Sequence, residues 1–268
     1  MASKRVLFIS QEIFPYVEEN EVSKISRFLP QQIQEAGKEI RAFMPRYGVV
    51  NERRFQLHEV IRLSGMNMVI DDADRQLIIK VASIQPARMQ VYFIDGEDYF
   101  HRKAVLQDED GTYFPDNDER SVFFSRGVLE TVIKLRWAPD IIHCHGWFSA
   151  LIPFYLKSAY SDNPLLNEAK IVYSAYNNDF EGHYSESFHE KMLLDGIDLE
   201  SIKHLSSASC FDVNKLAIDN SDAVIYGSEQ INSDLTKYIK DSNVLSLAYQ
   251  GDDYVSAYNN LYDKLLES

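Results

Sequence analysis

The first 45 residues follow a strand, helix, strand pattern, and this pattern constrains the fold more than any other feature. Val6 to Ser10 is a short apolar run of the kind that forms a buried strand. From Ser23 apolar residues recur at helical spacing as far as Gly37, a residue type that often follows a helix end. Glu39 to Met44 supplies a second strand, and Pro30 predicts a kink or a break in the helix between them. Such a βαβ unit predicts an α/β fold with a mostly parallel sheet.

After an interruption over residues 50 to 95, the rest of the chain again alternates between predicted strands and helices. Residues 50 to 95 predict successive strands, the middle ones forming a hairpin excursion on one side of the sheet: Phe55 to Leu63, Met66 to Ile70, Leu77 to Ile84 and Met89 to Asp95. An acidic loop is predicted over residues 96 to 118. Helices are then predicted at Asp118 to Leu135, Trp147 to Tyr160, Cys210 to Asn220, Glu229 to Ile239 and Tyr254 to Leu266, and strands at residues 141 to 145, 170 to 175 and 223 to 226. We therefore predict one Rossmann-like, doubly wound α/β domain over residues 1–268.

Charge and cysteine content narrow the possible partners and the compartment. A formal net charge of −14 disfavours binding to nucleic acid and to an anionic membrane surface. Cys144 and Cys210 provide no disulfide framework and fit a reducing compartment. The apolar run near the amino terminus is too short for a signal peptide, and no stretch approaches the ~20 residues of a membrane span. These features predict a cytoplasmic protein.

A short strand that ends in His143-Cys144-His145-Gly146-Trp147 is the first candidate for a binding site. Ligands of open α/β sheets bind at the carboxyl ends of the strands, where these side chains would lie. His143 and His145 are two residues apart and share one face, as two zinc ligands could. No third ligand is spaced nearby, so the sequence favours no metal site. That the histidines only pack a loop remains an open alternative.

Other catalytic patterns are absent from the sequence. There is no G-x-S-x-G nucleophile elbow. No two glycines are separated by a single residue, so every G-x-G dinucleotide fingerprint is missing, and so is the P-loop pattern. We therefore expect no cofactor in this domain.

Nearly the whole chain resembles the amino-terminal catalytic domain of bacterial glycogen synthases and plant starch synthases. The segments that carry the resemblance, in the right order and with similar spacing, are Val6 to Pro15, Leu29-Pro30, Met44 to Tyr47, Val91 to Asp95, Pro139 to Trp147, Tyr176-Asn177, Glu181-Gly182, Lys215 and Ser221 to Val224. The resemblance implies the amino-terminal half of a two-domain GT-B glycosyltransferase. In that family this half holds the α-1,4-glucan acceptor, the other half holds ADP-glucose, and glucose is transferred with retention at the interface.

The resemblance also implies the site residues. His145 takes the place of the histidine in the family's H-D-W motif, beside the donor sugar, and is the candidate catalytic residue. The candidate substrate-binding residues are Glu12, Trp147, Asn177 and Lys215. At three further positions the side chain differs from the family's: Gly146 replaces the aspartate of H-D-W, Tyr176 replaces the histidine of an H-N pair, and Phe100 falls where an acceptor-contacting tyrosine is expected.

The largest departure lies at the family's K-T-G-G-L loop, which cradles the donor phosphate at a helix N-terminus. Here the aligned residues are Glu18 to Val22, so the lysine has become Glu18, both glycines are gone, and Lys24 stands where an aspartate is expected. Two unit charges about 5 Å apart at an effective dielectric of about 20 interact by roughly 3 kcal/mol. Exchanging attraction for repulsion of that size predicts a large loss of donor affinity. Acidic residues also suit a helix N-terminus for local reasons, and the two readings are compatible.

The sequence ends at Ser268, about where the donor-binding domain would begin in the family. We therefore expect the chain to be incomplete as an enzyme, and whether it acts as one stays open. Three hypotheses remain: a glucosyltransferase that works with a separate donor-binding chain or a second copy of itself, a non-catalytic glucan-binding or regulatory relative, and a Rossmann-like domain with an unrelated ligand.

Overall fold

The computed structural model describes residues 3–85 and 87–267. Over these residues the chain forms ten strands: β1 (Arg5–Ser10), β2 (Glu39–Pro45), β3 (His58–Glu59), β4 (Met66–Ile70), β5 (Ala73–Ile84), β6 (Met89–Asp95), β7 (Ile141–His145), β8 (Lys170–Ala175), β9 (Ala223–Tyr226) and β10 (Leu245–Leu247). The α-helices are α1 (Glu21–Glu35), α2 (Glu52–Phe55), α3 (Glu97–Phe100), α4 (Asn117–Leu135), α5 (Leu151–Lys157), α6 (Phe188–Lys191), α7 (Leu199–Ile202), α8 (Cys210–Asp219), α9 (Ser233–Asp241) and α10 (Tyr254–Glu267). Two 3₁₀ turns span Trp147–Ser149 and Lys203–Leu205.

The strands form one mostly parallel sheet, as the sequence predicts. Its order is β10-β9-β8-β7-β1-β2-β6-β5-β3, with β4 pairing beside β5. The pairs from β10 across to β6 are parallel, whereas β5 runs antiparallel to β6, β3 and β4. The predicted hairpin excursion is therefore confirmed as the β4–β5 hairpin, which extends the sheet past β6.

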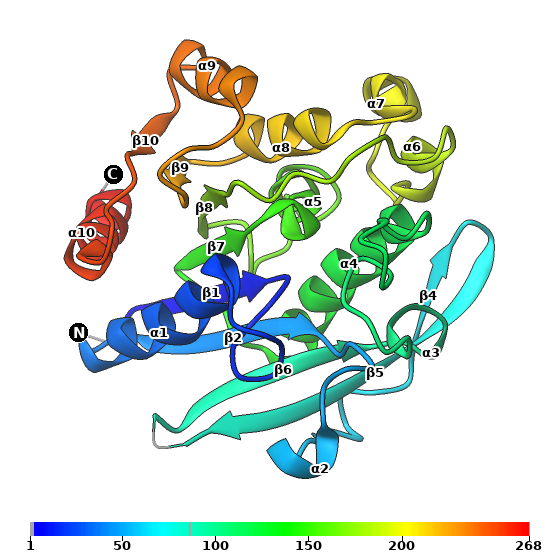
Figure 1. The fold of residues 1–268 in the computed structure, drawn as a ribbon, viewed down its shortest axis with the longest axis horizontal. Helices are drawn as coiled ribbons and strands as arrows, with labels where there is room; N and C mark the ends of the chain where they lie inside the picture. Colours follow the sequence, from blue (N-terminus) through cyan, green and yellow to red (C-terminus); the bar gives the residue numbers. More distant parts are fainter. Residues whose placement is uncertain (1–2, 86, 268) are drawn as a thin grey trace.

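Helices cover both faces of the sheet, which makes the fold doubly wound. Helices α1 and α10 lie on one side, and α4, α5 and α8 lie on the other (Figure 1). Strands β1 and β7 at the centre are buried almost throughout, as expected of parallel strands packed on both faces. None of the helices in the described ranges is long and apolar enough to cross a membrane.

Helix α1 begins at a strong local signal. The Asn20 side-chain oxygen accepts a hydrogen bond from the backbone N–H of Ser23, and the Ser23 hydroxyl accepts one from the backbone N–H of Asn20. These two bonds form a capping box. Pro30 does not divide the helix, because the burial of Leu29 and Ile33 against the sheet compensates for one missing backbone hydrogen bond. The chain then leaves through Gly37 at φ +97°, as the sequence predicts.

Four other predicted elements need correction. Phe55 to Leu63 is not a strand: α2 ends there, Gln56 adopts a left-handed conformation, and only β3 pairs with the sheet. The predicted helix from Trp147 to Tyr160 is a 3₁₀ turn followed by the shorter α5. The predicted helix from Glu229 starts late, at Ser233, where the Asn232 side chain caps it. Short α3 lies inside the predicted acidic loop.

Helix α10 covers the part of the sheet face that α1 leaves open. Its Tyr258 and Tyr262 are buried, and the Tyr262 hydroxyl lies 2.6 Å from Nδ1 of His143 on β7. Lys38, just after α1, bonds to Asp263 at 2.8 Å and to Asn259 at 2.7 Å. Helix α10 therefore shields the side of β7 that carries the two histidines from solvent.

Candidate functional site

The candidate site lies where the winding of the sheet reverses. The chain leaves β1 through α1 toward β2, whereas it leaves β7 through α5 toward β8 on the opposite side. Ser10 at the end of β1 pairs in register with His145 at the end of β7. The residues that follow them, Gln11 and Gly146, therefore flank the crevice at the carboxyl edge, where open α/β sheets bind ligands.

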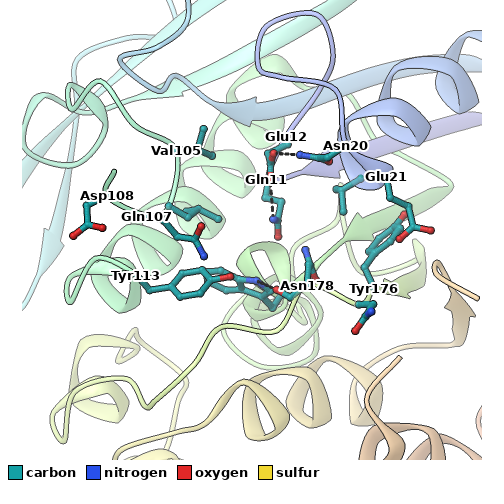
Figure 2. A pocket seen from close by; sticks show the side chains of 14 residues that line it. Gln11, Glu12, Asn20, Glu21, Val105, Gln107, Asp108, Tyr113, Tyr176 and Asn178 are labelled. Atoms are coloured by element: carbon teal, nitrogen blue, oxygen red, sulfur yellow. Dashed lines mark hydrogen bonds between the residues drawn. The ribbon is translucent and has the colours of Figure 1, made fainter. Parts of the chain in front are cut away.

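A cavity of about 460 Å³ opens at this edge (Figure 2). Its lining combines side-chain amides, carboxylates, aromatic rings and a few aliphatic groups: Gln11, Glu12, Asn20, Glu21, Val22, Val105, Leu106, Gln107, Asp108, Tyr113, Trp147, Tyr176, Asn177 and Asn178. The loop before α4 forms one wall, and the start of α1 with the end of β8 forms the other (Figure 2). Glu12, Trp147 and Asn177, three of the four predicted substrate-binding residues, are brought together here.

The charge of the cavity is negative. Glu12, Glu21 and Asp108 line it, and among the described residues neither a lysine nor an arginine does. Glu12 accepts hydrogen bonds from the side-chain amides of Gln11, at 3.0 Å, and Asn20. An anionic ligand would therefore meet carboxylates rather than cations on this wall.

The N-terminus of α1 carries its own anions. Asn20 caps the helix, and Glu21 occupies its first turn, where the helix dipole favours a carboxylate. Ser228 follows β9, and its hydroxyl donates a hydrogen bond to the Glu21 carboxylate. The same hydroxyl accepts a hydrogen bond from the backbone N–H of Asn177 at 2.9 Å. Glu18 is exposed beside this terminus. Of residues 18–22, Asn20, Glu21 and Val22 line the cavity.

His145 lies beneath the cavity and is not part of its wall. Its side chain is completely buried, and its Nδ1 lies 2.7 Å from the hydroxyl of Tyr176, which does line the cavity. Its Nε2 is buried without a protein partner. Burial lowers the pKa of His145 to about 3, so the imidazole is neutral near pH 7. It can orient Tyr176 but supplies no proton as an imidazolium.

The neighbouring His143 is held on both sides. Its Nδ1 bonds with Tyr262 and its Nε2 lies 2.7 Å from the Ser174 hydroxyl, while its ring centre lies 3.9 Å from that of His145. Burial, and secondly the adjacent His145, lowers the pKa of His143 well below its ordinary value. Both ring nitrogens of His143 are used within the protein. Across the described part of the chain no group of three or more His, Cys, Asp or Glu residues is placed to hold a metal.

Trp147 forms the floor of the cavity with its neighbours. The indole N–H donates to the carbonyl of Asn178 at 2.9 Å, and the ring packs edge-on against Tyr113 and Phe180. Only 1% of Trp147 is exposed, so its main effect is to hold the floor rigid. Tyr113 is only half-buried and presents an aromatic ring at the wall.

Two of the residues singled out by resemblance lie elsewhere. Lys215 sits on α8, 3.8 Å from Asp219 and over the ring of Tyr238, and does not line the cavity. Phe100 is completely buried against Tyr47, so it does not reach the cavity either. Neither residue is placed to contact a ligand in the cavity.

Sequence reasoning missed several lining residues. Gln11 and Asn178 follow the ends of β1 and β8 closely, so the strand-end rule could have found both. Gln107 and Tyr113 pair through an isolated antiparallel bridge in the loop before α4, and no local pattern marks them.

Comparisons with known proteins identify the family of the chain. The family model for the starch synthase catalytic domain matches residues 5–244. The glycogen synthase of Pelodictyon phaeoclathratiforme is 33% identical over 242 residues, which is 87% of this chain and 48% of that protein. That of Chlorobium limicola is 38% identical over 174 residues, or 65% of this chain and 36% of that protein. The chain thus spans less than half the length of these curated relatives.

A solved structure supports the fold independently. The catalytic domain of starch synthase IV from Arabidopsis thaliana, bound to ADP and acarbose, superposes with a TM-score of 0.71 at 20% identity. The match covers 98% of this chain and 50% of that one. The mostly parallel α/β sheet is thereby confirmed as that of one half of a GT-B enzyme. From the family-model match over residues 5–244, the chain belongs to the starch synthase catalytic-domain family.

Proposed function

We propose that this domain binds a neutral α-glucan in the cavity at the carboxyl edge of β1, β7 and β8. The observation that carries the proposal is the lining, which combines amides, carboxylates and aromatic rings without a cation among the described residues. Sugar hydroxyls donate to carboxylates and both donate to and accept from side-chain amides. The cavity, at about 460 Å³, has the size of an ordinary small-molecule site.

We further propose that the domain does not hold the diphosphate of ADP-glucose by itself. The phosphates would lie against Glu21 and near Glu18 at the start of α1. A donor-binding chain, or a second copy of this one, would then have to supply the positive charge. The Arabidopsis catalytic domain, half of which this chain matches, is bound to ADP and acarbose, and the acarbose supports a glucan as the ligand class of this domain.

His145 keeps a role in this proposal only as a neutral group. Its Nδ1 holds the Tyr176 hydroxyl, whose pKa burial raises well above its ordinary value, so the hydroxyl stays protonated. The pair can fix the position of the Tyr176 ring at the cavity wall. A catalytic contribution of His145 would therefore be a hydrogen bond and not a proton transfer.

The second candidate is a glucan-binding or regulatory domain without transfer activity. The capping of α1 favours it, because the Asn20 side chain already accepts from the Ser23 backbone amide and Glu21 places a negative charge in the first turn, where a phosphate would otherwise lie. Glucan binding is common to both candidates, and only glucose transfer separates them.

Titration calorimetry with maltotriose tests the binding site. Asn177→Ala should weaken affinity about three- to tenfold, because an exposed lining amide is lost without disturbing the fold. Asn260→Ala is the matched control, since Asn260 is exposed on α10 away from the cavity lining. An unchanged affinity in Asn177→Ala, or no binding of maltotriose to the unaltered chain, would overturn the proposed site.

Transfer of radiolabelled glucose from ADP-glucose to glycogen separates the two candidates. We expect no transfer by the purified chain alone. Transfer above the background of a cell extract, once the chain is added, supports an enzyme that needs a partner, and an unchanged background supports the non-catalytic alternative. Efficient transfer by the chain alone would contradict the proposed lack of a donor site.

A further inference from the structure

Two amide side chains at the floor of the cavity each keep one buried polar atom unpaired. The Nε2 of Gln11 donates to Glu12 at 3.0 Å, which leaves Oε1 as the free acceptor, and this Oε1 has no protein partner. The Nδ2 of Asn178 is likewise buried without a partner. Gln11 itself is only 2% exposed. Buried polar atoms are normally hydrogen-bonded, so this pair needs an explanation.

The two free atoms both lie beside Gly146. A β-carbon at Gly146 would stand 2.5 Å from Oε1 of Gln11 and 3.6 Å from Nδ2 of Asn178. Figure 2 shows the ends of the two side chains near each other at the centre of the view. Gly146 has φ +78° and no side chain, and a β-carbon there would collide with the Gln11 amide, so the glycine lets the two amides lie close together.

An acceptor and a donor that both lie beside Gly146 define the chemistry of the group they can bind. A hydroxyl satisfies both, because it donates to Oε1 of Gln11 while its oxygen accepts from Nδ2 of Asn178. A carboxylate or phosphate cannot donate to Oε1 and would also lie near Glu12. An aliphatic group would leave both amide atoms unpaired in a desolvated place.

We propose that Gln11 and Asn178 form a specificity-determining pair that recognises a single hydroxyl group of the bound sugar. This inference rests on the proposed function, because it assumes that the cavity receives an α-glucan. The pair makes affinity depend on one hydroxyl far more than on the others. A ligand that lacks this hydroxyl leaves both atoms buried and unpaired, which is the situation in which sites discriminate most strongly.

Titration with maltotriose and a set of its singly deoxygenated derivatives tests the pair. In the unaltered chain, one derivative should lose at least tenfold in affinity while the others stay within about threefold. The isosteric variants Gln11→Met and Asn178→Leu remove the free polar atoms and should reduce that discrimination to less than threefold. Thermal unfolding followed by circular dichroism verifies that each variant is folded.

Gln107→Ala is the matched control, because Gln107 is another amide of the same lining. It should weaken all sugars alike and keep the discrimination. Equal affinities for every derivative in the unaltered chain would overturn the pair and leave glucan binding intact. Discrimination that survives in both Gln11→Met and Asn178→Leu would show that these amides do not recognise the hydroxyl, and would overturn the pair. Failure of maltotriose itself to bind would overturn the proposed function together with the pair.

Discussion

Replacing His145 should flatten the dependence of stability on pH. His145 is completely buried and its pKa is about 3, whereas a histidine in the unfolded chain titrates near ~6.5. Below pH ~6.5 the unfolded chain takes up a proton on this side chain and the folded protein does not. The stabilisation is therefore complete above that pH and is lost as the pH falls toward 3. His143 acts in the same direction, because burial also lowers its pKa.

The size of the effect follows from the two pKa values of His145. Each pH unit below ~6.5 costs about 1.4 kcal/mol of unfolding free energy for one such histidine. Between pH 6.5 and pH 5.0 the loss from His145 is therefore about 2 kcal/mol. Below pH ~5 carboxylates also begin to titrate, so the range from 8.0 to 5.0 isolates the histidines.

Urea unfolding at several pH values between 8.0 and 5.0 measures this dependence. The variant His145→Gln keeps a polar atom for the Tyr176 hydroxyl and cannot titrate, so its slope below pH 6.5 should be shallower by about 1.4 kcal/mol per pH unit. His204→Gln is the control, because His204 is exposed and its replacement should leave the slope unchanged. If His145→Gln keeps the slope of the unaltered chain, His145 does not remain neutral in the folded protein and the reasoning is wrong.

Two further substitutions test how the buried polar groups are held. Tyr262→Phe removes the hydroxyl that bonds to Nδ1 of His143. We expect the free energy of unfolding measured in urea to fall by about 1–3 kcal/mol, and a fall below ~0.5 kcal/mol would refute the hydrogen bond. Lys191→Met removes the ammonium group 2.9 Å from the fully buried Asp118 carboxylate. We expect the free energy of unfolding to fall by about 3 kcal/mol, the low end of the range for breaking a buried ion pair, because Asp118 still accepts from other donors. Equal stability of Lys191→Met and the unaltered chain would contradict that ion pair.

The sequence predicted the centre of the fold well because local signals determine it. The apolar run of β1, the capped and periodic α1, and the glycine that follows it agree with one another over a short span. The predicted strand from Phe55 to Leu63 was wrong because local signals there conflict. Its apolar residues suggest a strand, but the Asn51 cap starts α2 just before it and Gln56 turns the chain in a left-handed conformation.

The site was only partly predictable. Glu12, Trp147 and Asn177 follow strand ends, and the parallel sheet brings strand ends to one edge. Strand alternation correctly placed His143 and His145 on one face, yet it could not reveal that α10 packs against His143 and helps to bury it. That burial depends on a helix more than a hundred residues along the chain, and no local pattern encodes it.

We propose above that this domain has a cavity for a neutral glucan and no site that binds the donor diphosphate. Calorimetric titrations of one sample of the chain, with maltotriose and in parallel with ADP-glucose, test it most directly. We predict saturable binding of maltotriose and no measurable binding of ADP-glucose at the same concentrations. Saturable binding of ADP-glucose to the chain alone, with none of maltotriose, would contradict the claim.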